Sequence, residues 1–226
     1  MHPMLWTRPD LAFAVSTLGQ FSSDPSDVHW KVGMDVLRYV RGTLDLALIF
    51  HGSDTYELVG YADSDWAADK QTGKSMFGYA FFMGGSLVSW KCKKSQTVAT
   101  SSTVAEIEAL YNAITEGIWI SNLLESIGIE NVRPFLVYQD NQAVIAIVTG
   151  ERVLERTKHE IVKIEFIRSK IQDGTAVVKY KETALMTADI FTKSLGKNLF
   201  GDHVKGLGME VLGNENEGEC GNVTLV

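Results

Sequence analysis

Four carboxylates in this sequence sit among apolar or small residues, where an unpaired charge is costly. Each falls where a strand is predicted to end or a helix to begin. Hard divalent cations take oxygen ligands, and two such ions can clamp both the attacking and the leaving oxygen of a phosphodiester. The order Asp, Glu, Asp, Asp, with a glutamate opening a long helix, therefore suits a two-metal nuclease. The four residues are Asp63, Glu106, Asp140 and Asp189.

The first of these, Asp63, follows an apolar segment that begins at Leu58 and includes Gly60 and Ala62. That segment predicts a buried strand that ends near the aspartate. Asp65 lies two residues later in a polar stretch more typical of a strand end or loop. Asp63 is the favoured ligand, and Asp65 stays open as an alternative.

Glu106 has a competing structural explanation. Thr103 and Glu106 have the spacing of a capping box, in which the glutamate would only cap its own helix. On helix geometry, however, Glu106 flanks the apolar stripe that contains Ile107 and Leu110, whereas Glu108 falls on a more polar line. Glu106 is thus the better candidate to face a site at the sheet edge.

Asp140 and Asp189 also have simpler interpretations. Asp140 closes the apolar strand 135–138 and precedes Asn141, so it could cap the next helix. Asp189 is predicted in the first turn of a short helix, where the helix dipole favours a carboxylate. Four such residues at element ends in this order are harder to explain by capping alone.

Two helices are predicted ahead of these residues, within a stretch, 7–50, that reads as helical throughout. Thr7 and Pro9 are typical of a helix start, and apolar spacing continues to Phe21. A second helix is predicted from Asp27 to Arg41, with Gly42 closing it. Two such helices cannot bury their apolar faces alone, so we expect them to pack on the remaining chain or on a partner.

From residue 56 onward the pattern predicts a mixed α/β sheet. Gly84 and Gly85 suit a hairpin turn between the second and third strands. The element order would allow the strand carrying Asp63 and the strand ending at Asp140 to lie side by side. Strands are predicted within 57–67, 74–85, 86–99, 134–140 and 175–180, and helices over 102–127, 141–148, 156–172 and 188–195.

The net charge of −7 is unusual for a protein that handles nucleic acid. Four glutamates, however, belong to a Gly/Asn-rich stretch without Lys or Arg, which predicts an acidic, disordered tail over 201–226. Without these four and the four candidate ligands, 20 of the 28 acidic residues remain against 21 basic ones. Acidity therefore does not exclude a nucleic-acid substrate. The tail glutamates are Glu210, Glu215, Glu217 and Glu219.

Composition also limits the class of protein. No run of about 18 apolar residues occurs, so no membrane span is expected. The first ten residues lack the layout of a signal peptide. Cys92 and Cys220 lie in unrelated contexts and indicate neither a disulfide framework nor a metal site. An intracellular location, cytoplasmic or nuclear, is the simplest expectation.

Four segments have distinctive wording: "GYADSDWAADKQTGKSMFGYAFFMGGSLVSWKCKKSQTVATSSTVAEIEAL", "YQDNQA", "ERTKH" and "ADIFTKSL". They resemble the ribonuclease H domain of copia-type LTR retrotransposon Pol polyproteins. Upstream, "TRPDLAFAVSTLGQFSSDP" and "HWKVGMDVLRYVRGTLDLAL" resemble the segment that joins the reverse transcriptase to that domain. The resemblance covers residues 6 to about 200. It implies a helical connection segment over 1–52 and a ribonuclease H-like domain over 53–200.

The implied fold is the α/β ribonuclease H-like fold: a five-stranded mixed sheet, with three antiparallel and then parallel strands, flanked by helices and preceded by a two-helix extension. The implied activity is endonucleolytic hydrolysis of the RNA strand of RNA–DNA hybrids. Asp63, Glu106, Asp140 and Asp189 match the family's four metal ligands, which imply two Mg²⁺ ions, with Mn²⁺ able to substitute. The implied partners are the hybrid and a reverse transcriptase polymerase domain, in the nucleus or in a cytoplasmic virus-like particle.

Substrate contacts are predicted from both the resemblance and local charge. Gln142 occupies the place of a polar residue that touches the hybrid in related enzymes, and Asn141 is its neighbour. Basic side chains in two clusters are candidates for phosphate contacts, with solvated surface positions as the alternative. Lys91 and Lys94 belong to one cluster, and Arg156 and Lys158 belong to the other.

The chain also departs from the family pattern. Val104 stands where a glutamate is usual, and Glu160 stands where an isoleucine is usual. The loop 181–187 has no histidine, whereas some cellular relatives carry one there. The polymerase aspartates are also absent, so we expect no polymerase activity from this chain. A catalytically inactive relic and a non-cleaving hybrid- or RNA-binding module are the alternatives. An integrase core is disfavoured because its carboxylates follow an Asp-Asp-Glu order.

Overall fold

The centre of the protein is a five-stranded mixed sheet with the strand order β4-β3-β2-β5-β6. It is seen in a computed structural model that describes residues 2–53, 55–129, 132–150, 160–213 and 223–224. The first three strands pair antiparallel, and β5 and β6 continue the sheet in parallel pairing. The predicted ribonuclease H-like arrangement is confirmed. The strands are β2 (Leu58–Asp65), β3 (Met76–Met83), β4 (Ser86–Lys94), β5 (Phe135–Gln139) and β6 (Ala176–Tyr180).

A tight hairpin joins β3 to β4 at the two glycines where the sequence predicted a turn. Gly84 and Gly85 have φ values of 55° and 83°, which side chains of L-residues rarely tolerate. The turn sets an antiparallel register in which Met83 faces Ser86.

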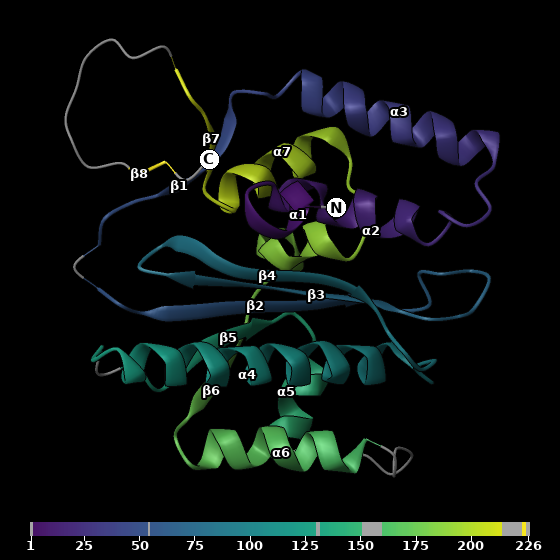
Figure 1. Cartoon of the computed structure of the whole chain (residues 1–226). Helices are drawn as coiled ribbons and strands as arrows, with labels where there is room; N and C mark the ends of the chain where they lie inside the picture. The colour runs from purple at the N-terminus through teal and green to yellow at the C-terminus, as the bar shows by residue number, and fades with distance from the viewer. Residues whose placement is uncertain (1, 54, 130–131, 151–159, 214–222, 225–226) are drawn as a thin grey trace.

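One face of the sheet is covered by helices α4 (Ser102–Ser126), α5 (Gln142–Val148) and α6 (Ile161–Gln172), which form the lower layers in Figure 1. The predicted stripe of α4 lies in the main core, where Ile107, Leu110 and Ile114 are fully buried. Burial of such side chains is a major stabilising contribution. The described part of α6 starts at Ile161, and the predicted helical residues 156–159 lie outside the described residues.

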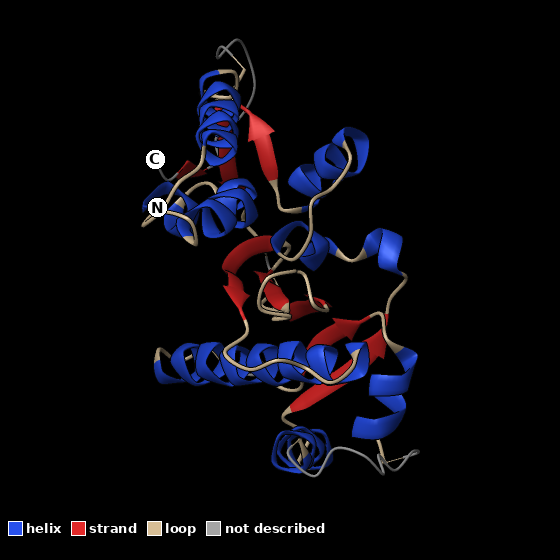
Figure 2. Ribbon diagram, turned by 90° about the vertical axis from the view of Figure 1, so that its right-hand side faces the viewer, coloured by secondary structure: helices blue, strands red, loops and turns tan. Residues whose placement is uncertain are grey.

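The opposite face carries the 3₁₀ helix η3 (Thr187–Phe191), helix α7 (Lys197–Gly206) and the N-terminal helices (Figures 1 and 2). Phe191, Val204 and Leu207 pack there against Phe82 and Leu87 of the sheet. The helix predicted over 188–195 corresponds to η3, which is shorter than predicted and of the 3₁₀ type. A further 3₁₀ turn, η2 (Thr183–Leu185), precedes it.

The N-terminal extension contains more elements than the two predicted helices. They are α1 (His2–Trp6), the 3₁₀ helix η1 (Pro9–Leu11), α2 (Ala12–Gly19) and α3 (Asp27–Arg41). The buried ion pair of Arg8 and Asp10 ties this region together, because Arg8 also donates to the Thr43 carbonyl and Tyr39 donates to Asp10.

None of the helices in the described part of the chain combines the length and apolarity that crossing a bilayer requires.

The helical prediction for 7–50 is wrong at its end. Residues 46–50 form strand β1 (Leu46–Phe50), which pairs antiparallel with β7 (Met209–Val211) and β8 (Val223–Thr224). The segment reads "LALIF", and a short apolar run cannot be assigned to helix or strand from periodicity alone. Its partner strands lie about 160 residues later, so no local pattern indicates the pairing.

The predicted disordered tail over 201–226 is also wrong for its first part. Helix α7 continues to Gly206 and strand β7 reaches Val211. The physical reason is burial, because Val204, Leu207 and Met209 all contribute to the second core cluster. Residues 214–222 and 225–226 lie outside the described residues.

Candidate metal centre

Three carboxylates converge where the ends of two strands meet the start of a helix. Asp63 lies near the end of β2, and Asp140 directly follows β5. The two strands pair in parallel, as expected, with Tyr61 opposite Tyr138. Glu106 reaches the same place from the second turn of α4, so that one oxygen from each of Asp63, Glu106 and Asp140 lies within 4.8 Å of the others.

Asp189 approaches this cluster from the other side of the sheet, on η3. Lys193 links it to Asp63: its Nζ atom is 3.0 Å from Asp189 Oδ2 and 3.6 Å from Asp63 Oδ2. The structure therefore places Asp189 beside the cluster of three, with Lys193 in contact with both its carboxylate and that of Asp63.

Burial makes the charges in this site costly. Asp63, Glu106 and Asp189 are 1%, 7% and 3% exposed. Burial, reinforced by neighbouring carboxylates, raises the pKa of Asp63 and raises that of Glu106 well above its usual value. The same causes raise the pKa of Asp189 to about 7. Burial lowers the pKa of Lys193, but Asp63 and Asp189 outweigh it, so that this pKa is raised.

These residues fit a divalent cation. All four offer carboxylate oxygens, the ligands preferred by hard cations. Asp189 Oδ1 is buried with no hydrogen-bond partner among the described residues. Lys193 supplies a single positive charge to a group of carboxylates whose ionisation is disfavoured by mutual repulsion. A cation bound among them would relieve that repulsion.

Two plant retrotransposon polyproteins match almost the whole chain. The Pol polyprotein from transposon RE2 of Arabidopsis thaliana is 34% identical over 206 residues, which is 91% of this chain. That from transposon TNT 1-94 of Nicotiana tabacum is 36% identical over 200 residues, or 88% of this chain. The chain is a homologue of the Pol polyproteins of copia-type retrotransposons. It spans 14% and 15% of the length of these two relatives.

Other comparisons are narrower. Secreted RxLR effector protein 161 of Plasmopara viticola is 47% identical over 121 residues, covering 54% of this chain and 85% of that protein. A ribonuclease H1 isolated from compost covers 61% of this chain and is covered to 93%, at 19% identity and a TM-score of 0.47. The match to the ribonuclease H1 of Halobacterium salinarum covers 60% of this chain and 94% of that protein, at 15% identity and a TM-score of 0.42. No family model matches the chain.

In this Pol homologue, the capping explanations for two of the carboxylates are wrong. Ser101 caps α4, with its hydroxyl accepting from the Val104 amide at 3.3 Å. Asn141, not Asp140, caps α5, because its Oδ1 atom accepts from the amides of Ala143 and Val144 at 3.0 and 3.2 Å. Both Glu106 and Asp140 are thus left for other interactions.

Among the residues that contact the carboxylates and were given no role from the sequence, three lie in segments quoted for the family resemblance. Gln139 is fully buried, and its Nε2 atom donates to Glu106 Oε2 at 3.3 Å, while its Oε1 atom accepts from the Asp140 amide at 2.8 Å. Thr192 donates to Asp63, and Lys193 pairs with Asp63 and Asp189. Their only sequence indication was membership of the segments "YQDNQA" and "ADIFTKSL".

The predicted substrate-contact residues occupy different environments. Gln142 is exposed at the first position of α5, and Lys91 is exposed on the edge strand β4. Lys94 instead pairs with Asp69 and donates to Gln20 at 2.9 Å. Asn141 uses its side-chain oxygen as a cap for α5, so this oxygen is already engaged within the protein. Arg156 and Lys158 lie outside the described residues.

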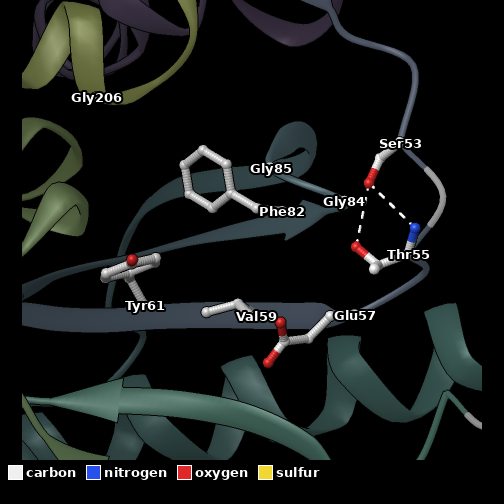
Figure 3. A pocket seen from close by; sticks show the side chains of 9 residues that line it. All are labelled: Ser53, Thr55, Glu57, Val59, Tyr61, Phe82, Gly84, Gly85 and Gly206. Carbon is white, nitrogen blue, oxygen red and sulfur yellow. Dashed lines mark hydrogen bonds between the residues drawn. The ribbon is translucent and has the colours of Figure 1, made fainter.

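A separate cavity of about 360 Å³ opens on the sheet face near α7 (Figure 3). Val59, Tyr61 and Phe82 line it, and a Ser53–Thr55 hydroxyl contact of 3.1 Å closes one side. Val59 precedes Asp63 by four residues, which corresponds to roughly 13 Å along a strand. The cavity is therefore at the other end of β2 from the carboxylates.

Proposed function

We propose that this chain is a metal-dependent endonuclease that hydrolyses the RNA strand of RNA–DNA hybrids. The observation that carries the proposal is the convergence of Asp63, Glu106 and Asp140, with oxygens within 4.8 Å, at the strand ends of a ribonuclease H-like sheet. Homology to retrotransposon Pol polyproteins supports the choice of substrate class.

Two Mg²⁺ ions are the proposed cofactors, with Mn²⁺ as a substitute. Asp63, Glu106, Asp140 and Asp189 would hold these ions through their carboxylate oxygens. Bound ions of this kind lower the pKa of the attacking water and stabilise the leaving 3′ oxygen. The protein's own part is to hold the ligands: Gln139 orients Glu106, and Thr183 donates to Asp140 Oδ2 at 2.7 Å.

Substrate contacts are proposed on both sides of the cluster. Hybrid selection would come from 2′-hydroxyl and phosphate contacts, without base readout. On one side, Asn141 and Gln142 directly follow Asp140 in the chain, and Asn141 would donate from its side-chain nitrogen. On the other side of the cluster, Gly78 on β3 pairs with Asp63 on β2 and with Cys92 on β4. Lys91 is the neighbour of Cys92, so its backbone lies near the level of Asp63, two strands away, or roughly 10 Å. Lys91 is therefore the stronger phosphate candidate, because Lys94 is already paired.

The partner proposed beyond the hybrid is a reverse transcriptase polymerase domain, since the plant relatives are Pol polyproteins. The proposed location is intracellular, in the cytoplasm or the nucleus.

A labelled RNA–DNA hybrid tests the proposal directly. We expect wild-type protein to cleave the RNA strand with Mg²⁺ or Mn²⁺, to lose activity with EDTA, and to leave duplex DNA and duplex RNA uncut. Asp140→Asn removes one ligand charge with little change of shape and should abolish cleavage. Absence of metal-dependent cleavage by the wild type would refute the nuclease proposal. Hybrid binding without cleavage would then favour the binding module, and neither property would favour an inactive relic. Equal cleavage by the variant would show that the site is wrong.

A further inference from the structure

We propose that Thr192 is a positioning residue of the metal centre, which fixes the carboxylate of Asp63 relative to the segment that carries Asp189. The inference deepens the proposed function and rests on it, because it concerns how the same carboxylates are held for a cation. Gly78 is the second part of the arrangement, since it provides the space in which Thr192 lies.

Thr192 contacts both carboxylate-bearing segments from a fully buried position. Its hydroxyl donates to Asp63 Oδ2, although the two residues are 129 positions apart. The same hydroxyl oxygen lies 3.2 Å from the Asp189 carbonyl oxygen, and the Thr192 amide donates to that carbonyl at 3.1 Å. One residue thus joins the side chain of Asp63 to the main chain of Asp189.

The chemistry of the hydroxyl decides which of these contacts matters more. A threonine hydroxyl has one hydrogen to donate, and a carboxylate is a stronger acceptor than a neutral carbonyl. The backbone amide already satisfies the Asp189 carbonyl. The hydroxyl hydrogen is therefore assigned to Asp63 Oδ2, the atom that Lys193 also approaches at 3.6 Å. Oδ1 is the oxygen of Asp63 that these two contacts leave for a cation.

Gly78 explains how Thr192 reaches the sheet. It lies on β3 directly opposite Asp63 in the antiparallel register. A Cβ atom at this position would lie 2.5 Å from the Phe191 Cβ atom and 3.2 Å from the Thr192 Cγ2 atom. The first distance is shorter than non-bonded carbon atoms allow, so the glycine permits the end of η3 to pack against the strand beside Asp63.

The decisive substitution is Thr192→Val, which keeps the side-chain shape and removes the donor. Residues that orient metal ligands typically change metal affinity or activity by 10- to 100-fold when they are removed. We expect Thr192→Val to weaken Mn²⁺ binding by about 10-fold or more and to lower kcat with little change in the KM for the hybrid. Thr192→Ser keeps the donor and should restore both properties.

Mn²⁺ binding is measured on the full chain without substrate, by electron paramagnetic resonance of the free ion, beside hybrid cleavage and thermal unfolding in EDTA. Thr187→Val is the matched control, since it makes the same chemical change at the first residue of η3, near Gly206, whereas Thr192 follows the last residue of that helix. It should bind Mn²⁺ like wild type.

The outcomes separate this inference from the proposed function. Weaker Mn²⁺ binding by Thr192→Val, with rescue by Thr192→Ser, would support the positioning role even if wild type does not cleave the hybrid. Unchanged binding and kcat in Thr192→Val would overturn it. Equal loss of binding in Thr192→Val and Thr192→Ser would also overturn it, because packing and not the hydroxyl would then be responsible. Absence of Mn²⁺ binding by wild type would refute both proposals.

Discussion

The two halves of the metal centre are built from different kinds of structure. On one side, Glu106 and Asp140 are held by a long helix and a parallel strand pair, and buried Gln139 hydrogen-bonds to both residues. On the other side, Asp189 sits on a five-residue 3₁₀ helix that reaches Asp63 through the side chains of Thr192 and Lys193. Regular backbone hydrogen bonding fixes the first half, whereas individual side-chain contacts fix the second.

The comparison teaches that the two halves should respond differently to substitution. Changes in the sheet half should alter catalysis while leaving the fold intact, because the backbone there is held independently of the carboxylates. Changes in the η3 half should alter stability and metal affinity together, because the same contacts hold the segment and the ligand.

The largest effect is expected for Glu106→Gln in the sheet half. It removes a ligand charge from a buried position without changing side-chain size, and hybrid cleavage should fall by at least about 100-fold, the upper range for residues that only orient ligands. Thermal stability in EDTA should not fall, because burial disfavours the charge that is removed. Initial cleavage rates and melting curves measure both effects.

Glu108→Gln on the same helix is the control for this substitution. It should cleave at a rate within about 2-fold of wild type, since Glu108 is partly exposed and lies outside the carboxylate cluster. A comparable loss of hybrid cleavage in both glutamate variants would argue against Glu106 as a metal ligand.

Gly78→Ala should destabilise the η3 half. The added Cβ atom would overlap the Phe191 Cβ position, and overpacking of this kind costs about 1–3 kcal/mol in the free energy of unfolding. Displacement of η3 should also weaken Mn²⁺ binding. Urea unfolding and Mn²⁺ titration of the full chain measure the two effects.

Gly33→Ala is the matched control for this second prediction. Gly33 lies in helix α3, where a Cβ atom would meet nothing within 4 Å, so the substitution should leave stability unchanged or raise it. If Gly78→Ala behaved like Gly33→Ala, the close packing of η3 on β3 would be contradicted.

Asp189→Asn should give a pH-dependent gain in stability of the metal-free protein. The folded-state pKa of Asp189 is raised to about 7, above its ordinary value of 3.8. A raised pKa means that the folded state binds more protons than the unfolded chain, so the contribution of Asp189 to stability is lost as pH rises through about 7. The variant should exceed wild type by on the order of 1 kcal/mol at pH 8 and by less at pH 4.

Urea unfolding in EDTA at both pH values measures this difference, and added Mg²⁺ should reduce it because the ion favours the ionised carboxylate of the wild type. A stability difference that is independent of pH would argue against the raised pKa.

Thr183→Val should have the smallest effect. The Thr183 hydroxyl donates to Asp140 Oδ2 at 2.7 Å, but Thr183 is exposed, so water can replace the lost donor. We expect a change of about 0.5 kcal/mol, or roughly 2-fold in Mn²⁺ affinity. Compared with Thr192→Val, this variant tests whether burial makes a threonine–carboxylate contact important. A loss equal to that of Thr192→Val would remove the distinction between the two halves.

The sequence was sufficient for most of the sheet half. Alternating and apolar runs predicted the five central strands, and the parallel neighbours β2 and β5 brought Asp63 and Asp140 together as expected. The apolar stripe of α4 favoured Glu106 over Glu108, and the structure places Glu106 in the carboxylate cluster. These features depend on local periodicity, which a single sequence records.

The η3 half was less predictable because its contacts connect distant parts of the chain. The bond from Thr192 to Asp63 depends on how η3 packs on β3, and the space for that packing comes from Gly78. Gly78 lies inside a strand and shows no turn pattern that would indicate its role. The predicted helix start at Asp189 and the resemblance of "ADIFTKSL" to the family both drew attention to this segment, and both identified Asp189 alone.

Strand β1 has a practical consequence for defining the foldable unit. A fragment ended at residue 200, where the sequence predicted the catalytic domain to stop, would lose β7, β8 and most of α7. Leu48 and Ile49, each 3% exposed in the full fold, would then lie on an unpaired strand edge, a known template for aggregation. Recombinant expression of a well-folded protein should therefore require the sequence through at least Val211.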